Sequence, residues 1–255
     1  MSADPARKVL LLEAGGSGSS PFVRVPNGIF FLKGKPSHHW LVETAPDPTR
    51  AGRRETLTCG KGLGGGSAVN GMVYVRGLAA DYAHWEERAG PLWSLAAVTA
   101  AFDRAESVIG PAIPEDMHPL AAAFLESAVA SGLPRLATTS IPEDPGVMAC
   151  PSSAARGLRR STAATYLKRA RRRPNLTVIT GAEAERLIAD GRRIRAVGYR
   201  KGGRRRIAEA RQEVILSCGS INTPKILMLS GIGPADHLQS HGIKVLHHSP
   251  GVGLG

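Results

Sequence analysis

Hydrophobic residues in this chain alternate between short unbroken runs and stretches with helical spacing. The run VLLLEAGG at residues 9–16 has the length of a strand and ends in Glu13 and two glycines. Such a run predicts a parallel strand that is buried on both faces. EVILS at 213–217 predicts a second buried strand. A glycine turn and a helix follow it, and we expect that helix to begin at Thr223-Pro224 and to end at Gly231.

Helical spacing marks three further stretches. Ser94–Ile109 starts with serine at an N-cap position, Pro119–Ser131 repeats the pattern, and Ser161 should cap an alanine-rich helix that ends near Arg172. Between Gly132 and Gly157, proline, serine and threonine predict irregular chain at the surface.

Four segments then predict strands of a β-meander that returns to the main sheet: NLTVIT, AERLIA, RAVGYR and EVILS. The whole pattern indicates an α/β fold, in which a cofactor domain is interrupted by an insertion. We expect residues 1–93 to form its first part, 94–160 a helical insertion with an irregular segment, and 161–255 its second part.

Charge and composition exclude some functions. The net charge of +12 suggests nucleic-acid binding, but the arginine clusters at 171–173, 192–193 and 204–206 fall at an expected helix end and in expected hairpin loops, without interleaved aromatics. We interpret them as a solvated surface. No segment has the apolar length of a membrane span and none resembles a signal peptide, so we expect a cytoplasmic protein. The three cysteines and eight histidines show no disulfide, zinc or other metal pattern.

The glycine-rich stretch Gly60–Gly77, GKGLGGGSAVNGMVYVRG, is the strongest candidate for a binding site. Glycines let backbone N–H groups approach a ligand closely, and a phosphate-bearing cofactor is the natural candidate. A flexible surface loop is the alternative. Glu13 would lie at the end of its strand, where an acid binds ribose hydroxyls in dinucleotide-binding folds. It could equally be a strand-end acid that faces water.

In such folds G-x-G-x-x-G precedes the acid by about 20 residues. Counting back from Glu13 passes Met1, so we expect the chain to begin inside the first helix, without strand 1 or the pyrophosphate loop.

Two motifs carry a family resemblance: GKGLGGGSAVNGMVYVRG, and GSINTPKILMLSGIG at 219–233. Both resemble signature patterns of the glucose–methanol–choline (GMC) oxidoreductases, flavoenzymes that oxidise alcohols. The resemblance covers almost the whole chain, apart from about 110–156. It implies an FAD-binding Rossmann-like domain of GMC type with a β-meander and inserted helices, truncated at both ends.

The resemblance also implies roles for individual residues. Glu13 matches the acid that binds the ribose of the adenosine half of FAD, and Val178 matches a position whose backbone meets adenine. Val69 stands where some relatives attach flavin to a histidine, so FAD should bind non-covalently. The remaining matched residues are the loop around the cofactor, Gly62, Leu63, Gly64 and Gly65, and the segment along the isoalloxazine ring, Asn70, Gly71, Met72 and Val73.

We expect the function to be oxidation of a small-molecule alcohol, choline-like or another primary alcohol, by hydride transfer to FAD. The family's general-base histidine lies near the end of a much longer chain, so we assign no catalytic residue here and expect this chain alone to be inactive. Two alternatives stay open: a nicotinamide-dependent Rossmann enzyme, and a non-catalytic flavin- or partner-binding remnant. Truncation would favour association with a complementary fragment or a second copy.

Overall fold

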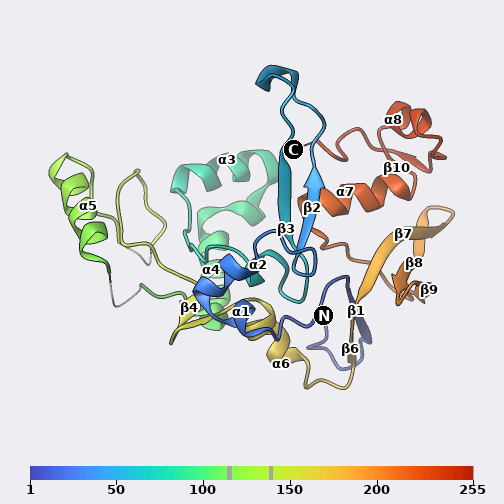
Figure 1. Ribbon diagram of the computed structural model, residues 1–255, viewed down its shortest axis with the longest axis horizontal. Helices are drawn as coiled ribbons and strands as arrows, with labels where there is room; N and C mark the ends of the chain where they lie inside the picture. Colours follow the sequence, from blue (N-terminus) through green and yellow to red (C-terminus); the bar gives the residue numbers. More distant parts are fainter. Residues whose placement is uncertain (114–116, 138–139, 255) are drawn as a thin grey trace. The chain divides into compact units, whose positions relative to one another are not determined.

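The computed structural model describes residues 1–113, 117–137 and 140–254. The chain divides into two compact units, and each is built from segments that are far apart in the sequence. The first unit contains Met1–Ser17, Gly34–Leu63 and Arg173–Gly255, and the second contains Gly18–Lys33 and Gly64–Arg172. Figure 1 labels the helices and strands of both units.

A parallel strand pair opens the first unit. Strand β1 (Val9–Glu13) pairs with β6 (Leu176–Thr180), in register from Val9 opposite Leu176 to Glu13 opposite Thr180. The predicted parallel strand is therefore confirmed. Burial on both faces is not, because Leu10 is 43% exposed. Among the described residues, β1 has β6 as its one ladder partner, so its other edge is unpaired.

Antiparallel strands form most of the remaining sheet structure in this unit, where β10 (Ile232–Gly233) and β11 (His247–His248) are a second, very short parallel pair. Strand β2 (His39–Glu43) pairs with β3 (Thr56–Gly60), and β7 (Ala182–Asp190), β8 (Arg193–Lys201) and β9 (Arg204–Glu209) form a meander. NLTVIT was wrongly placed in that meander, since its residues prefer the apolar β1 as a parallel partner.

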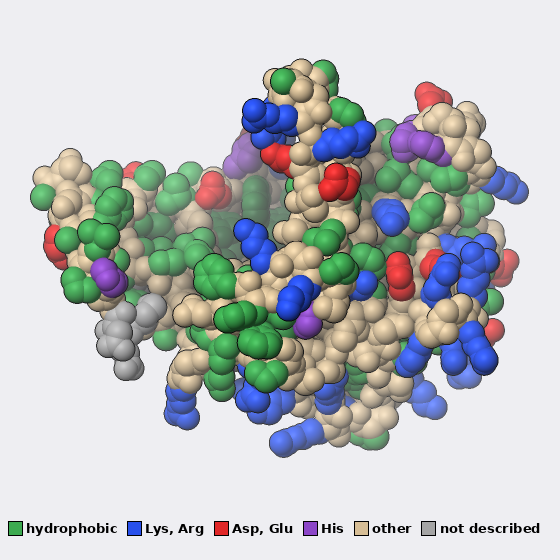
Figure 2. All heavy atoms as spheres, viewed as in Figure 1, with side chains coloured by type: hydrophobic (Ala, Val, Ile, Leu, Met, Phe, Trp, Pro, Cys, Tyr) green, Lys and Arg blue, Asp and Glu red, His purple; other side chains and the backbone are tan. Residues whose placement is uncertain are grey.

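Arg204–Arg206 were wrongly placed in a hairpin loop. They begin strand β9 and pair with Tyr199–Lys201 of β8, because the turn is made by the glycine pair that precedes them. Figure 2 shows lysine and arginine side chains gathered over this meander.

The carboxyl-terminal part of the first unit packs helix α7 (Gly219–Leu229) against β7. Its core contains Leu187, Val197 and Ile226. Small elements complete the unit: β10 (Ile232–Gly233), α8 (Ala235–Ser240) and β11 (His247–His248).

Two predictions for this part are wrong. EVILS is not a strand, because it has no ladder partner in the described chain. Val214 and Leu216 still pack on the core, whereas Ile215 is 55% exposed. Helix α7 begins at Gly219 and contains Pro224 in its interior. The hydroxyl of Thr223 accepts a hydrogen bond from Cys218 N (3.1 Å), so this residue closes the turn into the helix and does not begin it.

The second unit is mostly helical. Its helices include α4 (Leu95–Ile109) and α5 (Pro119–Ala130), both as predicted, and Ser94 Oγ accepts a hydrogen bond from Ala97 N (3.3 Å) at the N-cap of α4. The other described elements are α1 (Pro21–Arg24), η1 (Pro26–Gly28), α2 (Ile29–Leu32), η3 (Gly65–Ala68), α3 (Ala79–Ala89), η4 (Pro91–Trp93), β4 (Ala154–Ala155), β5 (Leu158–Arg159), η5 (Ala163–Leu167) and α6 (Lys168–Ala170). A 3-10 turn, η2 (Pro48–Arg50), belongs to the first unit.

The predicted helix after Ser161 is shorter than expected. Ser161 Oγ does accept from Ala164 N (3.2 Å), as an N-cap should. Leu167 N then donates to Thr162 O, five residues back, so the chain winds as the π-helical turn η5 and the α-helical turn α6 ends at Ala170. Between Gly132 and Gly157 the described chain is irregular apart from β4, as predicted.

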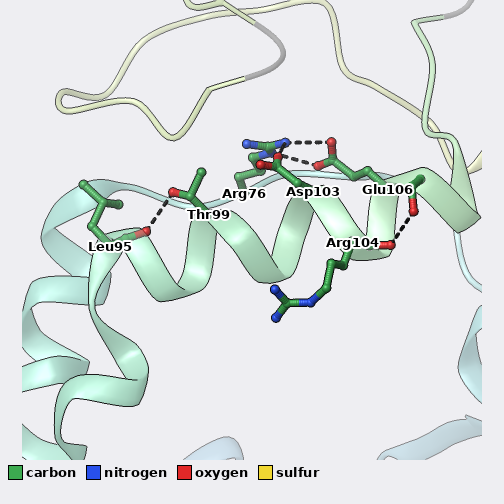
Figure 3. A network of polar contacts seen from close by, with 7 residues as sticks. Arg76, Leu95, Thr99, Asp103, Arg104 and Glu106 are labelled. Atoms are coloured by element: carbon green, nitrogen blue, oxygen red, sulfur yellow. Dashed lines mark hydrogen bonds and ion pairs between the residues drawn. The ribbon is translucent and has the colours of Figure 1, made fainter.

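A buried ion pair joins Arg76 to helix α4 in the second unit (Figure 3). Arg76 donates to both carboxylate oxygens of Glu106 on α4 (2.8 and 2.7 Å) and its side chain is 8% exposed. Asp103 is a second, exposed acidic partner of Arg76 at 3.3 Å. The hydrogen bond from Arg76 lowers the pKa of Glu106. The Arg76 guanidinium lies over the Phe102 ring, which makes edge-to-face contacts with Tyr74 and Tyr82. Tyr82 makes a further such contact with Trp85.

No helix in the described residues is both long enough and apolar enough to cross a membrane.

Candidate functional site

The Glu13 carboxylate joins the end of β1 to the glycine-rich loop. Its Oε1 accepts hydrogen bonds from the backbone N–H groups of Gly15 (2.7 Å) and Gly62 (3.0 Å). Leu63 N donates to Gly16 O (3.0 Å) beside them. A Cβ at Gly15 would lie 2.4 Å from Gly62 N, so only glycine lets the two backbones meet here.

The first unit therefore brings together four of the predicted residues. Glu13, Gly62 and Leu63 are in contact through the bonds above, and Leu63 is 2% exposed. Val178 lies on β6, opposite Leu11 and two positions before the residue that pairs with Glu13. This places a carboxylate and a backbone strand edge at the carboxyl end of a parallel pair.

The second unit holds the rest of the glycine loop, starting with Gly64. Gly64 and Gly65 have φ of +96° and +51°, a conformation that favours glycine, and they lead into η3. Ser67 Oγ donates to Gly64 O (2.6 Å) and accepts from Thr162 N (3.0 Å). The loop is thus fastened to the turn that begins η5.

Residues in and next to the β4–β5 hairpin hold the segment Asn70–Val73 in place through hydrogen bonds. Arg159 Nη1 donates to the main-chain oxygen of Asn70 (2.7 Å) and to its side-chain Oδ1 (2.8 Å). Met72, whose φ is +65°, accepts at its carbonyl from Ser153 N (2.8 Å). Val73 is 67% exposed. The segment presents one face to solvent while its other face is bonded to the protein.

Sequence reasoning missed Arg159 and Ser153. The hairpin that carries them turns at Arg156 and Gly157, both with positive φ, as in a type I′ turn. An Arg-Gly pair is an uncommon signature for such a turn, and it lies at the end of the stretch where the family resemblance is poor. The pair Arg159-Arg160 gives no sign in the sequence that the first member is only 4% exposed. Burial lowers the pKa of Arg159.

Val69 does not face the solvent side of this segment. It packs against Val23, Leu32 and Ala68, which form the apolar cluster under α1 and α2. Its side chain is saturated carbon, so it offers no atom for a covalent link to a cofactor. The glycine conformations, the close backbone approach at Gly15 and the carboxylate at a strand end fit a dinucleotide cofactor such as FAD.

No cluster of three or more histidine, cysteine or acidic side chains that could hold a metal occurs in the part of the chain described. A shallow cavity of about 260 Å³ lies in the second unit, between Tyr74–Leu78 and the irregular segment that includes Leu136 and Met148. None of the predicted site residues lines it. Burial raises the pKa of Tyr74 at its edge to about 12.

Comparison with known proteins covers nearly the whole chain. The family model for GMC oxidoreductases matches residues 9–254. An uncharacterised GMC-type oxidoreductase of Mycobacterium tuberculosis is 41% identical over 270 aligned residues, which include 99% of this chain and 51% of the relative. An oxygen-dependent choline dehydrogenase of Rhizobium etli is 36% identical, over 99% of this chain and 48% of the relative.

Solved structures agree with this result. Pyridoxine 4-oxidase from Mesorbium loti matches with a TM-score of 0.88 at 30% identity, over 98% of this chain and 52% of that one. A formate oxidase variant from Aspergillus oryzae, studied for modification of its FAD, matches with a TM-score of 0.86 at 27% identity, over 98% and 47%. The chain spans about half the length of these relatives. The matches confirm the expected family, fold class and cofactor: the chain belongs to the GMC oxidoreductases, which use FAD.

Proposed function

We propose that these residues form the FAD-binding part of an enzyme that oxidises a small alcohol, choline-like or another primary alcohol. One observation carries the proposal. The Glu13 carboxylate holds the turn after β1 and the glycine loop together at the carboxyl end of a parallel strand, the place where dinucleotide-binding folds bind their cofactor. The choline dehydrogenase among the relatives supports the choice of an alcohol substrate.

Each predicted residue has a role in this proposal. When bound, FAD supplies the chemistry by accepting hydride from the alcohol. Glu13 would hold a ribose hydroxyl through Oε2, and the backbone of Val178 would meet adenine. Asn70 would contribute a side-chain hydrogen bond near the ring. The other proposed contacts are mainly backbone contacts, from Gly62, Leu63, Gly64, Gly65, Gly71, Met72 and Val73.

The resemblance places the general-base histidine outside these residues. We therefore propose that the chain by itself does not turn over alcohols, even with FAD added. Three other expectations stay predictions: the three domain ranges, the cytoplasmic location, and the association with a complementary fragment or a second copy.

Titration with FAD tests the proposal. We expect the purified chain to bind FAD, with quenching of flavin fluorescence, and acid precipitation to release all of it because Val69 cannot form a bond. Glu13→Gln keeps an acceptor oxygen but exchanges charge-assisted hydrogen bonds for neutral ones, so FAD binding should weaken about tenfold, or about 1.4 kcal/mol. Glu43→Gln is the matched control, since Glu43 ends β2 and its carboxylate accepts from Thr56 Oγ1 (2.6 Å), away from the glycine loop.

Three outcomes would contradict parts of the proposal. Binding of NAD in place of FAD would favour a nicotinamide-dependent enzyme. Flavin that stays in the acid pellet would refute non-covalent binding. Equal FAD affinities of the Glu13 and Glu43 variants would contradict the proposal that Glu13 binds the ribose.

A further inference from the structure

Among the residues that the structure describes, Arg159 is the most buried charged residue of the second unit. Its exposed fraction is 4%, and no described carboxylate forms an ion pair with it. Nε and Nη2 are buried without a hydrogen-bond partner, so all of its bonds are made by Nη1. A buried guanidinium without a counter-charge is costly for folding, which suggests that it serves a purpose other than stability.

The bonds of Nη1 go to the segment that precedes and includes Asn70. Nη1 donates to Ser67 O (3.3 Å), Asn70 O (2.7 Å) and Asn70 Oδ1 (2.8 Å). The same Oδ1 accepts from Met72 N (3.1 Å). Both partners of this atom are obligate donors, so it must be the oxygen of the amide and not the nitrogen.

The orientation of the Asn70 amide follows from this. Asn70 is exposed, and its Nδ2 group has no acceptor among the described residues. With the oxygen turned inward to two donors, the group left to face a ligand is the NH2. An isoalloxazine ring carries carbonyl oxygens and ring nitrogens that accept hydrogen bonds, so a donor is the complementary group.

We propose that Arg159 is a positioning residue, which turns the Asn70 side chain so that its NH2 group faces the flavin. This inference rests on the proposed function for the identity of the ligand. The orientation itself rests only on the contacts above. Arg160, the next residue, is the matched control: it donates to Val108 O (3.0 Å) and to Ile109 O at the end of α4 and does not contact Asn70.

The first arm of the test needs no cofactor. In NMR spectra of the ¹⁵N-labelled chain, Arg159→Met should shift the Asn70 Nδ2 and Met72 amide resonances and speed the hydrogen exchange of the Met72 amide. Arg160→Met should leave these resonances in place. Arg159→Lys should restore them in part, because an ammonium can donate to Oδ1 but cannot keep the planar geometry of the guanidinium. Unchanged resonances in Arg159→Met would overturn the inference.

The second arm is a double-mutant cycle on FAD affinity. We expect Arg159→Met to weaken FAD binding about tenfold in the natural chain but only about twofold when Asn70 is already alanine. Equal factors in the two backgrounds would mean that Arg159 does not act through Asn70, and would overturn the inference. If no variant and not even the natural chain binds FAD, the proposed function fails. The first arm then still decides the orientation of Asn70.

Discussion

Single glycines control the close approach between the end of β1 and the glycine loop. We predict that Gly15→Ala disrupts the site, because its Cβ would lie 2.4 Å from Gly62 N and 2.6 Å from Lys61 C, both of them backbone atoms that cannot move independently. Overpacking of this kind costs about 1–3 kcal/mol. Denaturant unfolding and FAD titration measure the effect. Gly16→Ala is the control, since a Cβ there meets nothing within 4 Å. Equal stability of the two variants would contradict the prediction.

At the same scale, the sequence predicted Glu13 and the glycines because each rests on a local rule: an acid after a buried run, and glycine where the backbone must approach closely. It could not predict Arg159 or Ser153. Their roles depend on a hairpin that brings them to Asn70 and Met72 from more than 80 positions away. Local pattern carries no information about such a pairing.

At the scale of elements, local rules again predicted what is local. Helices α4 and α5 follow from spacing and from the Ser94 cap, and β1 follows from its apolar run. The prediction of a strand at EVILS was wrong because a strand needs a partner strand. Nothing in the EVILS sequence itself shows whether a partner lies beside it. The predicted length of the helix after Ser161 was wrong. A π turn differs from an α turn only in its hydrogen-bond register, and spacing in the sequence does not distinguish the two.

The attachment of helix α4 to the segment around Arg76 gives an element-scale prediction. Glu106→Gln should destabilise the second unit by about 3 kcal/mol at neutral pH, because it leaves the buried Arg76 guanidinium with only the exposed Asp103 as a described counter-charge. Asp103→Asn is the control and should cost less than about 1 kcal/mol, since Asp103 is 64% exposed. Denaturant unfolding of both variants measures the difference, and equal losses would contradict it.

The same pair predicts a pH dependence. The pKa of Glu106 is lowered in the folded chain, first by the hydrogen bond from Arg76. Its contribution is therefore fully present above the unfolded carboxyl value, near 4.5, and is lost as the pH falls through the lower folded value. The difference in unfolding free energy between the natural chain and Glu106→Gln should shrink in that acidic window. A difference that stays constant down to low pH would contradict this assignment.

At the scale of the whole molecule, the chain crosses between its two units several times, and one crossing lies inside the glycine loop, between Leu63 and Gly64. Each unit consequently depends on segments that are distant in sequence. The apolar cluster of the second unit shows this, because Val23 and Leu32 come from one segment and Ala68 from another. Composition and spacing predicted an α/β fold but could not show how its segments are shared between the units.

The segment that supplies Val23 and Leu32 also exposes large hydrophobic side chains, seen over α1 in Figure 2. Phe30 is 76% exposed and Phe31 62% exposed, and apolar patches of this kind promote association. We predict that Phe30→Ser raises the solubility limit and lowers self-association in analytical ultracentrifugation, with the unfolding midpoint changed little. Leu32→Ser is the contrasting variant: Leu32 is 3% exposed, so its loss should cost about 2–5 kcal/mol and not improve solubility. A Phe30→Ser chain that is less stable and no more soluble would mean that this phenylalanine is covered in solution.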